Sequence, residues 1–211
     1  VFGDSCSATS GGGLQYPPPV GTSADNYYQG RFSNGRVWVE YLADDLGLTF
    51  NTNHNFSNFG DYSEEVYNNI VYGNYYPPAD IATSLYIVWS ACSDCFYLAG
   101  TEETNSWTAG INDAMTNVTA VVDTLYSQGV RTLVLPNSVD ISKVPFFTYT
   151  AGSLGADTNA AAQLAASAHI QVQQYNAALA TTVSQLRAKH PDLTLYAPDF
   201  YSQFDILYNN P

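Results

Sequence analysis

The sequence predicts an α/β fold, in the form of a single three-layer α/β/α domain with a five-stranded parallel sheet. Three observations support this prediction. Short apolar runs alternate along the chain with longer segments of helical periodicity, which is typical of repeated βα units. The apolar runs are continuous, as expected for strands that helices cover on both faces. Finally, a length of 211 residues suits one domain with a sizeable core, so residues 1–211 are predicted to form a single domain.

Five segments are predicted as strands of this sheet. Val1 and Phe2 are expected to end a buried strand, and Gly3 permits the sharp turn that follows them. Residues 48–50 form a shorter apolar candidate. The other candidates are the apolar runs at residues 85–89, 131–136 and 193–198.

Helical periodicity predicts the elements between the strands. Gly129 is expected to stop one helix at its C-terminus, and His190-Pro191 to end a longer one. Residues 7–21 are predicted as an active-site loop, and residues 146–158 as a second long loop. The predicted helices span residues 37–46, 63–72, 107–125 and 164–186.

The charge balance excludes several classes of partner. The formal net charge is −13, from 6 Lys and Arg against 19 Asp and Glu, and the basic residues form no cluster. Nucleic acid and anionic membrane surfaces would be repelled, so neither is an expected partner. No apolar run approaches the roughly 20 residues of a membrane-spanning helix. The three histidines are scattered, so we expect no metal site and no cofactor. The oligomeric state stays open.

The composition favours an extracellular protein. Aromatic residues make up 14% of the chain, with 17 tyrosines, a balance common in secreted proteins that bind carbohydrate. Asn55-Phe56-Ser57 and Asn117-Val118-Thr119 are glycosylation sequons, so Asn55 and Asn117 are predicted glycan sites in a secreted glycoprotein. The three cysteines are Cys6, Cys92 and Cys95. A structural disulfide within or between their two loops is expected, and its pairing stays open.

The first residues of the chain carry the candidate nucleophile. Asp4 and Ser5 follow directly on the predicted first strand, at the edge where parallel sheets bind ligands. A nucleophilic hydroxyl needs such an exposed position, because it must reach both the substrate and a base. A Gly-Asp-Ser tripeptide alone is usually an ordinary turn. Its meaning therefore depends on the segments that follow it.

Those segments form a recognisable series. In their order and spacing they resemble the GDSL (SGNH) hydrolases, particularly the secreted fungal and bacterial esterases and lipases of that superfamily. The resemblance extends from Val1 to Pro211, and it implies a flavodoxin-like strand order. The segments that carry it, besides the Gly-Asp-Ser turn, are residues 30–43, 46–48, 55–60 and 89–95.

The resemblance implies how the site would work. Ser5 would be the nucleophile, and the oxyanion would be bound by the backbone N–H groups of Ser5 and Gly60 and by an asparagine side chain. Gly60 matches the glycine of the family's second block. Asp4 would have a supporting role beside the nucleophile.

The third oxyanion donor departs from the family pattern. The family has Gly-any-Asn-Asp where this chain has Ala91-Cys92-Ser93-Asp94, so Ser93 occupies the asparagine position. A serine hydroxyl donates one hydrogen bond and reaches less far than an amide. By analogy with the loss of other oxyanion donors, this change is expected to cost ~10²–10³ in rate. Asp94 matches the family's aspartate and is expected to organise the loop.

The catalytic base is not evident in the sequence. The family carries it in a C-terminal Asp-any-any-His block, and none of His54, His169 and His190 has an aspartate three residues before it. Each is expected to be a surface or capping histidine. Residues 199–211 resemble the segment that precedes this block. We therefore expect that this sequence lacks the block and the start of the first strand, and that the protein extends past both ends.

Two functions follow from these observations. The first is a secreted serine esterase that hydrolyses carboxylic esters, either acetylated carbohydrate or lipid esters, through Ser5. No cofactor is expected, and the substrate is a small-molecule or carbohydrate ester. The alternative is a catalytically impaired binding protein on the same scaffold, lectin-like or defensive. The serine at position 93 and the missing base favour this alternative, because fold alone does not determine function.

Overall fold

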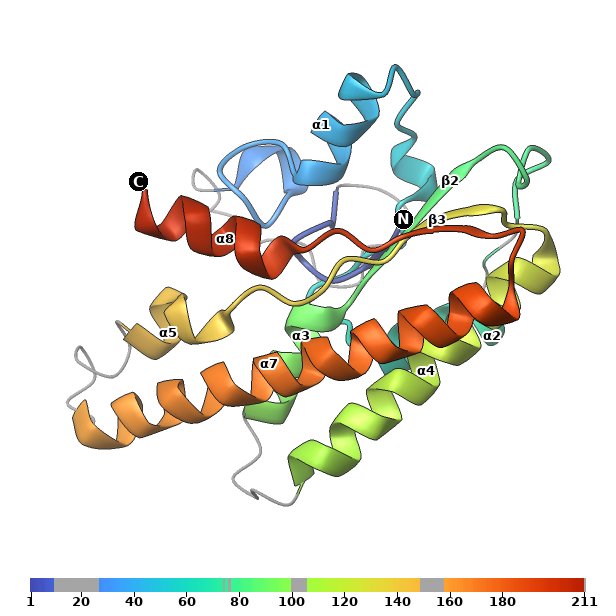
Figure 1. The fold of residues 1–211 in the computed structure, drawn as a ribbon. Helices are drawn as coiled ribbons and strands as arrows, with labels where there is room; N and C mark the ends of the chain where they lie inside the picture. Colours follow the sequence, from blue (N-terminus) through green and yellow to red (C-terminus); the bar gives the residue numbers. More distant parts are fainter. Residues whose placement is uncertain (10–26, 74, 76, 100–105, 149–157, 211) are drawn as a thin grey trace.

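The computed structural model describes residues 1–9, 27–73, 75, 77–99, 106–148 and 158–210 (Figure 1). Most of the two predicted loops, at residues 7–21 and 146–158, lies outside these residues. Within them, a parallel four-stranded sheet forms the centre of the domain, with the strand order β1-β2-β3-β4. The strands are β1 (Phe2–Gly3), β2 (Leu85–Trp89), β3 (Thr132–Val134) and β4 (Thr194–Tyr196).

The prediction of a fifth strand at residues 48–50 was wrong. Leu48 follows Gly47 at the end of a helix and is 46% exposed, so it does not enter the sheet. The edge beside β1 is instead lined by residues 54–58. The N–H of Phe56 donates to the carbonyl of Val1 at 2.8 Å, and the N–H of Asn58 donates to the carbonyl of Gly3 at 3.0 Å. This extended segment therefore takes the place that a flavodoxin-like order gives to its second strand.

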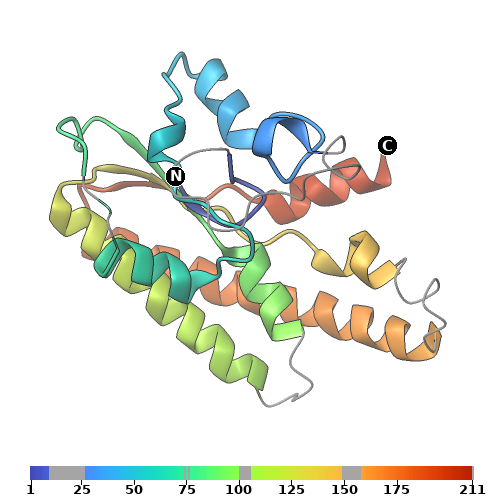
Figure 2. The same ribbon diagram turned by 180° about the vertical axis from the view of Figure 1, so that it is seen from behind.

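The helices lie on both sides of the sheet, which confirms the predicted α/β/α layers. Helices α1 and α8 lie on one side, and α2, α4 and α7 lie on the other (Figure 1, Figure 2). The four predicted helices correspond to α1, α2, α4 and α7. The helices are α1 (Trp38–Asp45), α2 (Ser63–Val71), α3 (Ala91–Ala99), α4 (Ser106–Gln128), α5 (Pro145–Thr148), α7 (Thr158–Lys189) and α8 (Phe200–Asn209). Short 3-10 turns are η2 (Tyr28–Gly30), η3 (Thr52–His54) and η4 (Ile141–Lys143).

The two faces of the sheet bury cores of unequal size. Tyr86 and Val88 of β2 point to the larger core, which they share with α2, α4 and α7. Ile87, between them in sequence, points to a smaller core under α1 together with Val39 and Val134. Since successive side chains of a strand point to opposite faces, both faces of β2 are apolar. This explains the continuous apolar run in the sequence.

The periodicity of the two long helices also holds. The apolar positions at helical spacing in α4 are all buried in the larger core; they are Trp107, Ile111, Ala114, Val118, Val121, Val122 and Leu125. In α7 the predicted positions from Ala168 to Leu186 are buried, whereas Leu164, one turn earlier, is 43% exposed. Within the described residues, no helix is both long enough and apolar enough to span a membrane.

Candidate active site

The nucleophile candidate Ser5 lies at the carboxyl end of β1. The turn begins at Gly3, where a Cβ atom would collide with the carbonyl oxygen of Trp89 on β2, so only glycine permits this approach of the two strands. Ser5 is half-buried. Its hydroxyl makes no hydrogen bond to any residue that the structure describes, so it is available to a substrate.

Asp4 fixes the turn that presents Ser5. It is 1% exposed, and its Oδ1 accepts the backbone N–H of Cys6 at 2.9 Å. Its Oδ2 accepts the hydroxyl of Ser93 at 3.1 Å. Burial raises the pKa of Asp4 to about 6, although these hydrogen bonds lower it. Asp4 therefore links the nucleophile turn directly to the first turn of α3.

Gly60 lies in the loop that follows residues 54–58. The bond from Asn58 N–H to the Gly3 carbonyl holds this loop beside the end of β1. Gly60 has φ +78° and is exposed, a backbone conformation that glycine adopts without strain. In the described part of the chain, no acceptor takes its N–H. The group is thus free to donate, as an oxyanion hole requires.

Asn55 anchors the nucleophile loop, a role that sequence reasoning missed. Its side chain is 1% exposed and donates to the carbonyl of Ser7 at 2.7 Å and to Thr9 Oγ1 at 3.0 Å. A glycan on this nitrogen would replace hydrogen bonds inside the protein. The other sequon residue, Asn117, is half-buried on α4, with its amide 3.5 Å from Ser63 Oγ. Asn117 is therefore the more available of the two predicted glycan sites.

Asp94 connects three helices beneath the site. It is 3% exposed and accepts the N–H of Ser63 on α2 at 2.8 Å and the hydroxyl of Tyr175 on α7 at 2.6 Å. The hydroxyl of Ser90 donates to it at 3.3 Å. Burial raises the pKa of Asp94. With its hydrogen-bond capacity used inside the protein, Asp94 positions the start of α3 and does not face the substrate.

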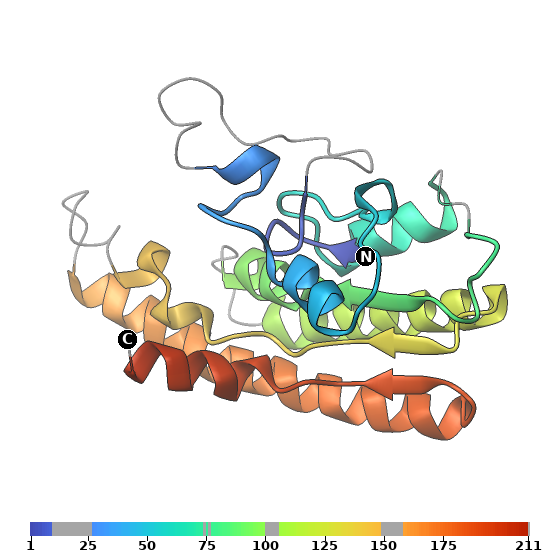
Figure 3. The ribbon, with the colours of Figure 1, turned by 90° about the horizontal axis from the view of Figure 1, so that it is seen from above.

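The structure thus brings the predicted site segments together. The turn at Ser5 adjoins the first turn of α3 through the Asp4–Ser93 bond, and it adjoins the Gly60 loop through the Asn58–Gly3 bond. Figure 3 shows the chain after β1 beside the start of α3, beyond the carboxyl ends of the strands. The arrangement offers a free hydroxyl and free backbone donors at one edge of the sheet.

None of the three histidines hydrogen-bonds to Ser5 within the described residues. His54 is exposed on η3, and its carbonyl accepts the amino group of Val1 at 2.9 Å. His190 lies 2.6 Å from Asp123 through Nε2, as a histidine after the end of α7. The exposed position of His54 agrees with the surface role expected for it, whereas His190 is buried and its side chain pairs with Asp123.

His169 forms a pair with Asp140 that the sequence did not predict. Its Nδ1 lies 2.7 Å from Oδ2 of Asp140, a fully buried carboxylate in the loop between β3 and η4. Burial alone would raise the pKa of Asp140, but hydrogen bonds from Ser142 and His169 lower it below the ordinary value. The two residues are 29 positions apart, so no local pattern relates them.

The three cysteines are free thiols in the structure. Cys6 is exposed, and Cys92 and Cys95 are buried in α3. The expected disulfide is therefore not formed here, although Cys6 and Cys92 lie near the same carboxylate of Asp4. Burial raises the pKa of both Cys92 and Cys95, which keeps these thiols protonated and unreactive.

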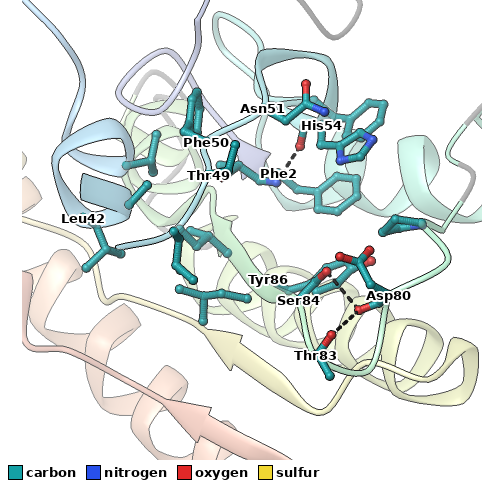
Figure 4. A pocket seen from close by; sticks show the side chains of 18 of the residues that line it. Phe2, Leu42, Thr49, Phe50, Asn51, His54, Asp80, Thr83, Ser84 and Tyr86 are labelled. Carbon is teal, nitrogen blue, oxygen red and sulfur yellow. Dashed lines mark hydrogen bonds between the residues drawn. The ribbon is translucent and has the colours of Figure 1, made fainter. Parts of the chain in front are cut away.

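A cavity of about 380 Å³ lies away from these groups (Figure 4). Phe2, Leu42 and Tyr86 contribute its apolar wall, and His54 and Asp80 also line it. It adjoins residues 85–87 of β2, which β1 does not reach, since β1 pairs with β2 only at Val88 and Trp89. Neither Ser5, Gly60 nor Ser93 lines it. Ligands of parallel sheets bind at the carboxyl ends of strands, so we do not assign the reaction to this cavity.

Comparison with known proteins identifies the family of the chain. A family model described as GDSL-like Lipase/Acylhydrolase matches residues 1–210. A curated relative from Zea mays, named "GDSL esterase/lipase ACHE", is 24% identical over 253 residues. The match covers 95% of this chain and 63% of the relative, so the chain spans less than two thirds of the maize protein.

Proposed function

Because the chain belongs to the GDSL-like lipase/acylhydrolase family, we propose that it is a serine ester hydrolase with Ser5 as its nucleophile. One observation carries this proposal above the others. The Ser5 hydroxyl is unpaired among the described residues, while Asp4 and Asn55 fix the turn and the loop around it. A nucleophile that is held in position and left without a partner is suited to attack a carbonyl carbon.

The proposed reaction has two steps. Ser5 Oγ attacks the ester carbonyl carbon and loses its proton to a base, and the alcohol leaves with a proton to give an acyl-enzyme. Water then hydrolyses the acyl-enzyme, which releases the acid and restores the serine. In each step, negative charge develops on the carbonyl oxygen. The N–H groups of Ser5 and Gly60 are the donors proposed to bind it. No histidine is assigned as the base, since none of the three contacts Ser5 among the described residues.

The hydrogen bond from Ser93 to Asp4 opposes a role for Ser93 as a third oxyanion donor. A hydroxyl has one hydrogen to donate, and that of Ser93 is directed to Asp4 Oδ2 at 3.1 Å. While Asp4 is ionised, donation to an oxyanion requires that this bond break. The proposal therefore gives the protein a two-donor oxyanion hole and a slow reaction compared with a three-donor site.

The finer aspects of the function are also proposals. The substrate is a small acyl ester, of a carbohydrate or of a lipid, and the 17 tyrosines favour carbohydrate. Secretion is proposed from the composition. Neither nucleic acid nor an anionic membrane is a proposed partner, because the net charge is −13.

A fluorophosphonate probe tests the nucleophile. The probe should label the wild-type protein at Ser5, and Ser5→Ala should abolish the labelling. The control is Ser127→Ala, an exposed serine at the end of α4, which should label like the wild type. Labelling at another serine would refute the assignment of Ser5.

The alternative function is a binding protein that has lost catalysis. The Ser93–Asp4 bond is the observation that favours it, because this bond removes a donor from the oxyanion hole. Under this alternative, a folded wild-type protein would neither react with the probe nor hydrolyse activated esters, and it would still bind its ligand.

A further inference from the structure

A second cavity lies between α2, α3 and α4. Its volume is about 150 Å³, and its lining residues differ from those of the larger cavity. Two of them are close in sequence to proposed oxyanion donors. Tyr62 is two residues after Gly60, and Asp94 directly follows Ser93. Ser5, Gly60 and Ser93 themselves do not line the cavity, so a ligand in it would lie outside the reaction centre.

Two stacked tyrosines form one wall of this cavity. The rings of Tyr62 and Tyr97 are 4.6 Å apart between centroids, with an angle of 14° between their planes. Tyr97 is 55% exposed although it stacks on Tyr62. The face of the Tyr97 ring that points away from Tyr62 is therefore open to solvent, and stacking on Tyr62 holds the ring in position. Such a ring offers a flat apolar surface at little cost in side-chain entropy.

The rest of the lining combines the apolar residues Leu98 and Ala114 with a polar and acidic part. In that part, Glu64 and Asp113 are exposed, and Asn117 is half-buried. In the part of the chain that the structure describes, neither carboxylate has an ion-pair partner. Two free carboxylates and a net charge of −13 would repel an anion. An acyl chain would remove water from these groups without replacing its hydrogen bonds, which is unfavourable.

We propose that this pocket binds one ring of a neutral carbohydrate. The apolar face of the ring stacks on Tyr97, and its hydroxyl groups donate hydrogen bonds to Glu64 and Asp113 and exchange them with the amide of Asn117. Each hydroxyl replaces a water molecule at an acceptor, so the polar wall is not left without partners. In terms of the proposed function, on which this step rests, the pocket would hold a sugar unit of an acylated carbohydrate outside the reaction centre at Ser5. Its binding of sugar does not itself depend on catalysis.

Unesterified oligosaccharides test the pocket independently of the reaction. The probes are xylotetraose, cellotetraose and chitotetraose, with binding measured by calorimetry on protein made in a bacterial host, so that no glycan is attached to Asn117. The wild type should bind at least one of them. Tyr97→Ala should weaken that binding by about tenfold, the range expected from the loss of a stacking ring, whereas Tyr97→Phe should retain most of it. Tyr196→Ala is the matched control, because Tyr196 is also 55% exposed but lies on β4.

The outcomes separate this proposal from the proposed function. If no probe binds the folded wild type, or if Tyr196→Ala weakens binding as much as Tyr97→Ala, the sugar pocket is refuted. Tetramethylammonium is the last probe. If the protein binds this cation but no sugar, and Glu64→Gln abolishes the binding, the pocket is a cation site and the proposal is overturned. Fluorophosphonate labelling of Ser5 in the same samples reports on the nucleophile alone. Sugar binding without labelling would support the pocket and favour the non-catalytic alternative.

Discussion

The substitution Ser93→Asn tests the proposed oxyanion hole most directly. The Ser93 hydroxyl has one hydrogen, and it points to Asp4 Oδ2 at 3.1 Å. An asparagine amide has two N–H bonds, so one can replace the bond to Asp4 while the other faces the substrate. Removal of one oxyanion donor typically costs ~10²–10³ in turnover. A restored donor should therefore raise kcat by about 10²-fold, with a smaller change in KM, because the gain arises in the transition state.

The assay is hydrolysis of p-nitrophenyl acetate, with rates expressed per active site after titration with a fluorophosphonate. Ser93→Leu, which branches at Cγ like asparagine, is larger and has no donor, is the steric control. Ser93→Ala should lose little activity, because the wild-type hydroxyl is already used by Asp4. The double variant Ser5→Ala/Ser93→Asn gives the background rate of hydrolysis in the absence of the Ser5 hydroxyl.

One result would refute this reasoning. If Ser93→Asn folds with an unchanged melting temperature and is no faster than the wild type, position 93 does not face the oxyanion. An equal gain for Ser93→Leu would have the same meaning, because it would show that bulk and not the donor causes the change.

Three further predictions concern the stability of the site. Burial raises the pKa of Asp4 from 3.8 to about 6, so ionisation in the folded state is unfavourable and the stability contribution of Asp4 falls as the pH rises from about 4 to 6. Asp4→Asn should reduce the change in the free energy of unfolding between pH 4 and pH 7 by about 3 kcal/mol, as measured by urea unfolding of the variant and the wild type at both pH values. If the free energies of the two proteins change equally with pH, the prediction is contradicted. Tyr175→Phe should cost about 1–3 kcal/mol in urea unfolding, because the buried carboxylate of Asp94 loses a donor at 2.6 Å; an unchanged stability would show that this bond contributes nothing. Asn55→Ala should cost at least about 2 kcal/mol, because it leaves the Ser7 carbonyl and other buried groups without partners, and a loss below about 0.5 kcal/mol would contradict the anchoring role.

The sequence predicted those elements whose side-chain pattern reflects burial. The apolar positions of α4 and α7 recur at helical spacing because they face one core, so both helices could be predicted. The prediction of a strand at residues 48–50 was wrong for the opposite reason. Leu48 is apolar but exposed, whereas the segment that does pair with β1 is polar and is held by backbone bonds to Val1 and Gly3. Backbone pairing of this kind leaves no hydrophobic pattern in the sequence.

The candidate site was predicted only in part. The turn after the first strand indicated Ser5, and the resemblance to the GDSL hydrolases implied Gly60 and Ser93. The contacts that hold the site together could not be predicted. Tyr175 and Asp94 are 81 residues apart, and Asp4 and Ser93 are 89 apart, so only the folded topology brings them into contact.

Asp4 unites these observations in one physical argument. Its two carboxylate oxygens hold the nucleophile turn through Cys6 and the start of α3 through Ser93. The bond to Ser93 is strongest while Asp4 is ionised, since charged acceptors bind hydrogen more strongly than neutral ones. The same ionised form is disfavoured by burial, which raises the pKa of Asp4 to about 6. Under the proposed function, in which Ser5 is the nucleophile, the serine at position 93 therefore couples a proposed oxyanion donor to the charge of the residue before Ser5. When Asp4 gains a proton, its hold on the Ser93 hydroxyl weakens, and the donor becomes free to face the substrate.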